Sequence, residues 1–316
     1  MARVETELLK PYPEKRKRSH RGWTQGLENQ TLLGYLLLFP IFIILIGLIS
    51  FPFITTIAFS FQNKLVGVKE SEWVGWDNYR ELLHNPIFLK TVVNSFVYTL
   101  LGVGIKCAVG LTTATVLNQP IRFRNFFRAL LFAPWAIPAV MTALNFRWIF
   151  DDMNGVLNLT LVRYFGRKEF IYFLSDPTIA MFSVIAVVVW QGTPFYSMNF
   201  LAGMQAVPAE LYEAADIDGA SSVQKFFYIT IPSIRHVIAI TVLLSTIWTA
   251  NEVQFVYILT NGGPDYATQI FPNLALELFQ GQHLLGRAAA VTLIFFPLFL
   301  IAITLLTRKM LRQTEL

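Results

Sequence analysis

Six long apolar segments, separated by shorter polar ones, set the pattern of this chain. Each is about 20 residues or longer, which an α-helix needs to cross roughly 30 Å of hydrocarbon. The segments lie at residues 32–60, 94–117, 126–149, 179–204, 234–259 and 286–308. The pattern predicts an all-α, polytopic membrane protein with six transmembrane helices. Its expected parts are an N-terminal segment (1–31), a transmembrane domain (32–308) and a short tail (309–316).

The composition supports a membrane protein and excludes a soluble one. Of the 316 residues, 54% are hydrophobic and only 14% are charged, which is too few to cover the surface of a soluble domain of this length. The net charge of +5 does not indicate a nucleic-acid partner, because the basic residues cluster beside the predicted spans, where topology requires them. Membrane lipid is the expected surrounding.

The loop charges predict the orientation. With the N-terminus inside, the cytoplasmic segments hold seven, three, two and three Lys and Arg residues, and the external ones hold four, three and none. This excess predicts that both termini are cytoplasmic. The external loops 60–93 and 150–178 are expected to carry short interfacial helices. The basic run Lys15–Arg21 is interpreted as a topology anchor, with a nucleic-acid patch as the weaker alternative.

The acidic connection between the fourth and fifth spans encodes two short helices with defined ends. Pro208 suits a first helical turn, and Glu210 complements the positive end of the helix dipole. Gly219 can end this helix in a left-handed conformation. Ser221-x-x-Gln224 has the form of a capping box for a second helix. The sequence thus predicts a cytoplasmic helix–turn–helix. Its acidity favours a protein partner over a lipid surface, since helices that lie on membranes are rich in Lys and Arg.

Two motifs in this half of the chain carry a family resemblance. The stretch Glu213–Pro232 has the spacing EAA-x3-G-x9-I-x-L-P, with Ile231 in place of leucine. It resembles the EAA loop of importer-type ABC transporter permeases. A second stretch, Leu259–Pro264 (LTNGGP), resembles the LTGGGP segment of carbohydrate-uptake permeases related to maltose importers. The residues of this external-loop motif are Asn261, Gly262, Gly263 and Pro264, of which Asn261 departs from the usual glycine.

The resemblance covers the chain beyond about residue 30 and implies a type I importer permease. In that family the loop 206–232 carries the coupling helix, which docks in a groove of a cytoplasmic ATPase subunit. The residues implied in this contact are Glu210, Glu213, Ala214, Ala215, Asp218 and Gly219. For Glu213, helix-end electrostatics stands as the alternative role.

The same resemblance implies the partners and the location. They are a second homologous permease, two ATPase subunits that hold ATP and Mg, and an extracytoplasmic sugar-binding protein. The location is the cytoplasmic (inner) membrane of a bacterium or archaeon. No cofactor is expected in this chain.

No catalytic motif is found in the chain itself. The sequence lacks G-x-x-x-x-G-K-[ST], so a P-loop is excluded, and it lacks G-x-S-x-G. The histidines are scattered without the spacing of metal ligands, so no metal site is expected. ATP hydrolysis must therefore come from another chain, and an enzyme within the membrane is disfavoured.

Polar residues within the predicted spans are the candidates for a substrate pathway, because they are costly unless they face a cavity or each other. Amides, hydroxyls and aromatic faces suit a sugar. The predicted pathway residues are Asn145, Trp148, Gln191, Tyr196, Asn199, Trp248, Asn251, Glu252 and Gln254. Interhelical hydrogen bonding is the alternative role for each of them.

Glu252 and Lys106 are the two charged residues predicted well inside spans. Three interpretations remain open: a structural ion pair, a Glu252 carboxylate that accepts a sugar hydroxyl, and a proton-coupled carrier.

The leading function is a permease subunit that moves a disaccharide or oligosaccharide inward by alternating access. A phosphorylated polyol such as glycerol phosphate would need basic residues at its site, for which only Lys106 and Arg147 are candidates. An ion-coupled secondary carrier has no need of a capped cytoplasmic helix with EAA spacing and should show inverted repeats or several buried carboxylates.

Overall fold

The computed structural model describes residues 30–312, which are helical over most of their length. Within these residues, four helices are long and apolar enough to cross a membrane, and up to six spans result if each of two bent helix pairs counts as one. The predicted all-α, multi-pass architecture is confirmed. The chain divides into two compact units, Met1–Thr55 and Thr56–Leu316. The basic run Lys15–Arg21 lies outside the described residues.

The first unit contributes most of the first span. It contains α2 (Gln30–Leu45), the π-helical turn η1 (Ile46–Ser50) and the start of α3 (Phe51–Ser60). The π-turn ends two residues before Pro52, which has no N–H to donate to the carbonyl of Leu48, so the helical register changes there without a break.

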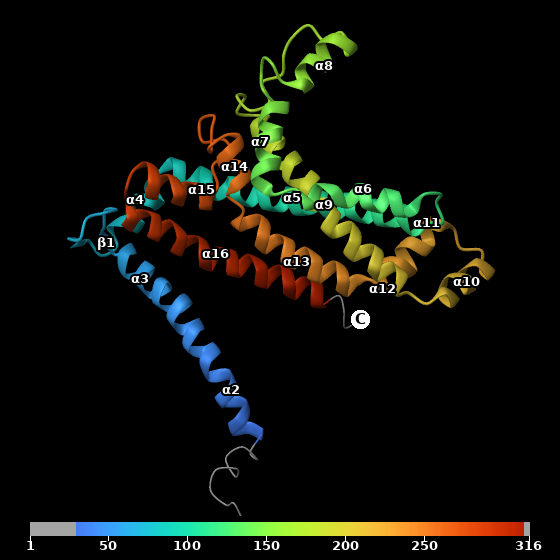
Figure 1. Cartoon of the computed structure of the whole chain (residues 1–316), viewed down its shortest axis with the longest axis horizontal. Helices are drawn as coiled ribbons and strands as arrows, with labels where there is room; N and C mark the ends of the chain where they lie inside the picture. Colours follow the sequence, from blue (N-terminus) through green and yellow to red (C-terminus); the bar gives the residue numbers. More distant parts are fainter. Residues whose placement is uncertain (1–29, 313–316) are drawn as a thin grey trace, which may run out of the picture. The chain divides into compact units, whose positions relative to one another are not determined.

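In the second unit, long helices run beside one another (Figure 1). They are α5 (Pro86–Asn118), α9 (Ala180–Gln205), α13 (Arg235–Asn251) and α16 (Leu285–Arg312). The closest pair is α5 and α9, because Gly110 lets the two backbones approach: a Cβ there would collide with the Cβ of Tyr196. Around this crossing, Val103, Tyr196 and Phe200 are buried in one apolar cluster.

The predicted third span, 126–149, is bent sharply rather than kinked. It consists of α6 (Arg124–Ala136) and α7 (Ala139–Ile149), which meet at 94°. Ile137 is extended (φ −81°, ψ 130°) because the ring of Pro138 disfavours the helical conformation in the residue before it.

Two other helix boundaries also differ from the prediction. The helix α5 begins at Pro86 rather than near residue 94, because the side chain of Asn85 accepts the N–H of Ile87 and Pro86 occupies the first helical position. The predicted fifth span, 234–259, is divided into α13 and α14 (Gln254–Leu259), with Glu252 at the break. A second bend of 68° separates Ser222–Ser233 from α13.

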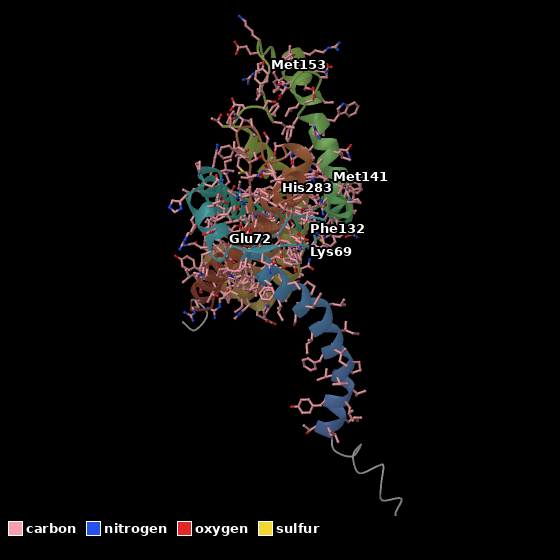
Figure 2. The ribbon with its side chains drawn as sticks, turned by 90° about the vertical axis from the view of Figure 1, so that its left-hand side faces the viewer. Lys69, Glu72, Phe132, Met141, Met153 and His283 are labelled. Carbon is pink, nitrogen blue, oxygen red and sulfur yellow. The ribbon has the colours of Figure 1, made fainter. Side chains whose placement is uncertain are left out.

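Short elements occupy the connections that the sequence predicts to be external. The first holds a two-stranded antiparallel hairpin, β1 (Gln62–Asn63) and β2 (Glu72–Trp73), followed by α4 (Asp77–His84). The second holds α8 (Val156–Phe165), which follows α7, and the side chain of Met153 projects outward in this region (Figure 2). After α14 come α15 (Phe271–Leu276) and the π-helical turn η3 (Glu277–Gly281).

Candidate functional site

A polar cavity of about 170 Å³ lies among α5, α6, α7, α9, α13 and α14. It combines hydrogen-bonding side chains with aromatic faces. Its lining residues are Lys106, Trp135, Ala139, Val188, Gln191, Gly192, Phe195, Ser245, Trp248, Thr249, Glu252 and Phe255. Small-molecule sites in proteins typically pair an apolar or aromatic lining with a few placed polar groups, as this cavity does.

Lys106 brings a cation into this cavity from α5. Its side chain is buried (4% exposed), and its Nζ donates a hydrogen bond to Oγ1 of Thr249 at 2.7 Å. The stem of the lysine crosses α9 at Gly192, where a Cβ would lie only 2.6 Å from Cδ of Lys106. Gly192 therefore makes room for the lysine.

Glu252 directly follows the last residue of α13, which corrects the prediction that it lies well inside a span. Its backbone is extended (φ −78°, ψ 107°), and its Oε1 accepts the N–H of Gln254 at 2.9 Å. The carboxylate thereby caps the start of α14. No ion pair joins Glu252 to Lys106 within residues 30–312, although both residues line the cavity.

Gln191 and Trp248 complete the polar and aromatic lining. The Nε2 of Gln191 donates to the carbonyl oxygen of Ile137 at 2.8 Å, which satisfies a backbone group freed by the bend between α6 and α7. The Oε1 of Gln191 is buried and has no hydrogen-bond partner within the described part of the chain. The Trp248 ring packs edge-to-face on Phe195, with centroids 5.0 Å apart.

Three of the nine predicted pathway residues thus line the cavity: Gln191, Trp248 and Glu252. Tyr196 instead lies fully buried in the helix-packing cluster between α5 and α9. The amides of Asn199 and Asn251 donate to carbonyls of their own helices, those of Phe195 and Ile247. The remaining three, Asn145, Trp148 and Gln254, are exposed and do not line the cavity.

The predicted pathway omitted several lining residues that a periodic signal in the sequence could have found. On α9 the lining residues follow the spacing i, i+3, i+4, i+7: Val188, Gln191, Gly192 and Phe195. On α13 and its end the same spacing relates Ser245, Trp248, Thr249 and Glu252. This spacing marks a single face of each helix.

A second site is the helix–turn–helix between α9 and α13. It consists of α10 (Ala209–Ile217), α11 (Ser222–Lys225), the π-helical turn η2 (Phe226–Thr230) and α12 (Ile231–Ser233). Gly219 has φ 75°, and its N–H and that of Ala220 bond to the carbonyls of Asp216 and Ala215, so α10 ends in a Schellman motif. Ser221 and Gln224 form the predicted capping box.

Two contacts fix α10 to the helix that follows it. The Nζ of Lys225 lies 2.5 Å from Oδ1 of Asp216, and the hydroxyl of Tyr212 lies 3.0 Å from Oγ1 of Thr230. Asp216 is therefore a brace within the segment. By contrast, the three other acidic residues of α10 and its end are exposed and form no ion pair within residues 30–312: Glu210, Glu213 and Asp218. Ala214 is exposed beside them, and Ala215 is half-buried.

The external-loop motif is a tightly packed turn. Asn261 (φ 49°) and Gly262 (φ 85°) both have left-handed backbones, and a Cβ on Gly262 would collide with Oε1 of Gln269. The hydroxyl of Thr268 donates to the carbonyl of Gly263 at 2.8 Å. The turn that begins with Pro264 is held to α5, because Lys90 donates to the carbonyl of Asp265 at 2.6 Å and Asn94 to that of Tyr266 at 2.9 Å. Within residues 30–312, no group of three or more His, Cys, Asp or Glu side chains could hold a metal ion.

The described chain is thus a mostly helical, multi-pass membrane protein with a polar cavity between its helices and a braced helix–turn–helix. Residues 106–310 match the family described as "Binding-protein-dependent transport system inner membrane component". The chain belongs to this family, and so is a transport component of the inner membrane rather than an enzyme.

Its relatives include permease proteins of several organisms. The trehalose/maltose transport system permease protein MalF of Thermococcus litoralis is 31% identical over 273 residues, 86% of this chain and 91% of the relative. The diacetylchitobiose uptake system permease protein DasB of Streptomyces coelicolor is 31% identical over 325 residues, 99% and 98% of the two chains. The sulfoquinovosyl glycerol permease protein SmoG of Agrobacterium fabrum is 32% identical over 281 residues, 87% and 90%.

The fold is shared with a solved transporter. A chain of a bacterial ABC transporter involved in the import of the acidic polysaccharide alginate superposes with a TM-score of 0.78. The match covers 92% of this chain and 98% of that one at 21% sequence identity.

Proposed function

We propose that this chain is the permease subunit of an ATP-driven ABC importer that moves a sugar, a disaccharide or oligosaccharide, inward by alternating access. The observation that carries the proposal is α10, a helix capped at its C-terminal end and braced by Asp216 and Tyr212, with Glu210 and Glu213 exposed and free of ion pairs in the described chain. A helix held rigid by its own segment and left charged on its outer surface is suited to dock into another protein.

In this proposal the docking partner is an ATPase subunit that binds ATP and Mg, and α10 transmits its closure to the spans. Two such subunits, a second homologous permease and an extracytoplasmic sugar-binding protein complete the importer. Both termini of this chain and α10 then face the cytoplasm, in agreement with the Lys and Arg bias of the loops.

The cavity supports a sugar as the substrate. Sugars present many hydroxyls and one apolar ring face, and the cavity offers Lys106 and Gln191 as hydrogen-bonding groups, Glu252 as an acceptor and Trp248 as an aromatic face. Relatives named for trehalose, maltose and diacetylchitobiose transport point to the same substrate class.

A phosphorylated polyol fits the cavity less well. Lys106 is the one cation in the lining, and Glu252 contributes a carboxylate to the same space, which would repel a phosphate dianion. Arg147, the other candidate, is exposed on α7 and does not line the cavity.

The proposal is tested with the assembled importer and its binding protein. Glu213→Arg should abolish both sugar uptake and ligand-stimulated ATP hydrolysis, because it reverses a charge on the docking face while leaving the brace of α10 in place. Glu70→Arg, an exposed charge reversal in the 60–93 loop, is the matched control and should leave both unchanged. Normal uptake by Glu213→Arg would contradict the coupling role. Uptake that persists without ATP but collapses with the proton gradient would establish a secondary carrier instead.

The substrate class is tested with the same complex. A panel of disaccharides, short oligosaccharides and glycerol phosphate is supplied with the binding protein, and stimulated ATP hydrolysis is measured. Stimulation by a sugar and not by glycerol phosphate is the expected result, and the reverse would establish the polyol importer.

A further inference from the structure

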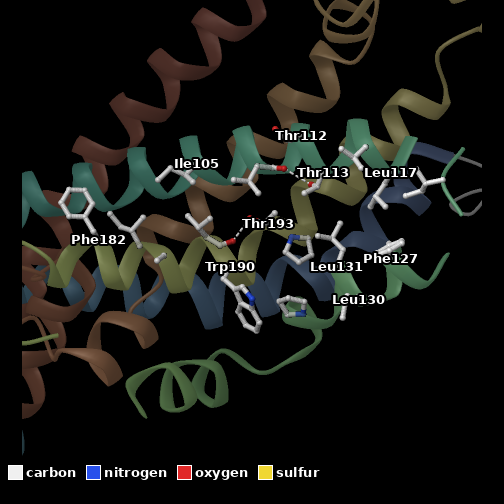
Figure 3. Close-up of a pocket in the computed structure, with 18 residues that line it drawn as sticks. Ile105, Thr112, Thr113, Leu117, Phe127, Leu130, Leu131, Phe182, Trp190 and Thr193 are labelled. Carbon is white, nitrogen blue, oxygen red and sulfur yellow. Dashed lines mark hydrogen bonds between the residues drawn. The ribbon is translucent and has the colours of Figure 1, made fainter. Parts of the chain in front are cut away.

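A second hollow in the described chain shares no lining residue with the polar cavity. It is an apolar groove of about 930 Å³ between α5 and α9 on one side and α6 on the other (Figure 3). Its walls include Ile105, Val116, Leu130, Phe182 and Trp190, all of them exposed. The hydroxyls of the threonines in its walls donate to carbonyls of their own helices, as Thr193 does to Val189 at 2.7 Å, so the groove offers a hydrocarbon surface.

Two arginines, Arg124 and Arg128, are next to lining residues at one end of the groove, although neither lines it. Leu117 and Phe127 lie at one end of it and Phe182 at the other (Figure 3). At the Leu117 end, Nε of Arg124 donates to the carbonyl oxygen of Leu117 at 2.6 Å. Arg128 follows Phe127 directly and is half-buried.

The two guanidinium groups have donors to spare. With its amide oxygen turned toward α6, Gln205 accepts from Nη2 of Arg128 at 2.5 Å and from Nη2 of Arg124 at 2.7 Å. The Nε of Arg128 is buried without a hydrogen-bond partner in residues 30–312. Arg122, exposed nearby in sequence, adds a third positive charge. Of the carboxylates in this part of the chain, none forms an ion pair with these three arginines.

We propose that the groove is a binding site for an anionic phospholipid, whose phosphate binds Arg124 and Arg128 and whose acyl chain lies along α5 toward Ile105. Guanidinium groups match phosphate geometry, and basic pockets beside transmembrane helices bind anionic headgroups. From Leu117 to Ile105, α5 rises about 18 Å at about 1.5 Å per residue, against roughly 15 Å for half of a hydrocarbon core of about 30 Å. One acyl chain therefore matches the groove in length as well as in polarity.

Arg124 and Arg128 lie on the same side of the protein as α10. Both contact Gln205, which is the last residue of α9, and α10 begins after three further residues. The lipid would come from the leaflet on the α10 side. This site does not depend on which substrate crosses the cavity, and its test is independent of transport.

The test is native mass spectrometry of the purified, delipidated full-length chain with phosphatidylglycerol and phosphatidylcholine of identical acyl chains. Phosphatidylglycerol should be retained preferentially. Arg124→Gln combined with Arg128→Gln should lower its retention about fivefold for each arginine removed. Ala186→Trp, which fills the groove from an exposed position, should lower retention of both lipids. Arg163→Gln combined with Arg167→Gln removes the same charge beyond α7 and should change nothing.

Three results would overturn the proposal. One is equal retention of the two lipids. Another is a pair of results: Ala186→Trp leaves lipid retention unchanged, and inorganic phosphate displaces the bound lipid as well as added lipid does. Together they would establish a site for free anions. The third is loss of the lipid when the chain assembles with its partner permease, which would show that protein covers the groove. Because Arg124→Lys with Arg128→Lys keeps the charge, it should retain most of the binding and serves as the control for folding.

Discussion

Gly262→Ala should destabilise the protein far more than the same substitution at another glycine with a left-handed backbone. Gly262 has φ 85°, and a Cβ there would collide with Oε1 of Gln269 and lie 2.8 Å from Nδ2 of Asn273. Gln269 cannot move freely, because it is fully buried and bonded to Glu277 at 2.6 Å and to Asn273 at 2.5 Å.

The magnitude follows from these contacts. The left-handed backbone costs about 1–2 kcal/mol for an L-residue. Displacing Gln269 leaves buried polar groups without partners, at about 1–3 kcal/mol each. With Asn273 and Glu277 both losing Gln269 as a partner, the expected loss in the free energy of unfolding is about 3–8 kcal/mol. Gly67 is the matched control, since it has φ 80° and no atom within 4 Å of the added Cβ, so Gly67→Ala should cost only the backbone strain.

The assay can use the only cysteine of the chain, Cys107, which lies half-buried in α5. A thiol-reactive fluorescent dye then reports thermal unfolding of the purified protein in detergent. Gly262→Ala should lower the midpoint well below that of Gly67→Ala. Combined with Gln269→Ala, the substitution should cost less than it does alone, because one of the two colliding side chains is gone and only the contact with Asn273 remains. Equal midpoints for Gly262→Ala and Gly67→Ala would refute the collision. Normal stability with lost uptake would show instead that the motif contacts the substrate or a partner.

Three further predictions follow from the same structure. Gly219→Leu should abolish uptake. It should lower the free energy of unfolding by only about 1–2 kcal/mol, the cost of the left-handed backbone, because no atom lies within 4 Å of the added Cβ. A large loss of thermal stability would contradict this. Asn158→Ala removes hydrogen bonds to the backbone of Asp152 and Ile171. Because these bonds hold the loop between α8 and α9, tryptic cleavage there should accelerate at least tenfold, and unchanged cleavage would show that other contacts hold the loop. The hydroxyl and then the N–H of Thr178 hold the pKa of Asp176 below its ordinary value, so this carboxylate turn just before α9 should persist at neutral pH and be lost only below pH 3.8, as hydrogen exchange of the Thr178 N–H can test; loss at pH 5 would contradict it.

The ends of α10 and α11 could be predicted from the sequence because their causes are local. A left-handed turn needs glycine, and Gly219 adopts it. A capping box needs a hydroxyl and an amide three residues apart, and Ser221 and Gln224 form one. Neither outcome depends on residues far away in the chain, so the residue types alone were sufficient.

The bends were harder to predict, because the residue types that permit a bend do not fix its size. Pro138 signals an interruption in the third span, but many transmembrane helices continue past a proline with a small kink. Here the amide of Gln191, from a helix more than fifty positions away, bonds to the freed carbonyl of Ile137. That contact between helices stabilises the open backbone. No proline or glycine in the sequence indicates the break at Glu252. In the structure, the contact that accounts for it is the Glu252 carboxylate, which accepts the N–H of Gln254 at the start of α14.

The cavity depends still more on tertiary contacts, and we infer from the setting of Lys106 that its charge serves function rather than stability. A buried lysine in a membrane span is costly, and a purely structural role would be better served by an apolar side chain or a close ion pair. Its one hydrogen bond in the described chain is to the Thr249 hydroxyl, and α9 carries Gly192 where the lysine stem crosses it. The fold thus accommodates a cation without neutralising it, beside the Glu252 carboxylate that also lines the cavity. Lys106→Met should then keep or raise the thermal midpoint while lowering sugar uptake at least tenfold. A lower midpoint with unchanged uptake would establish the structural role instead.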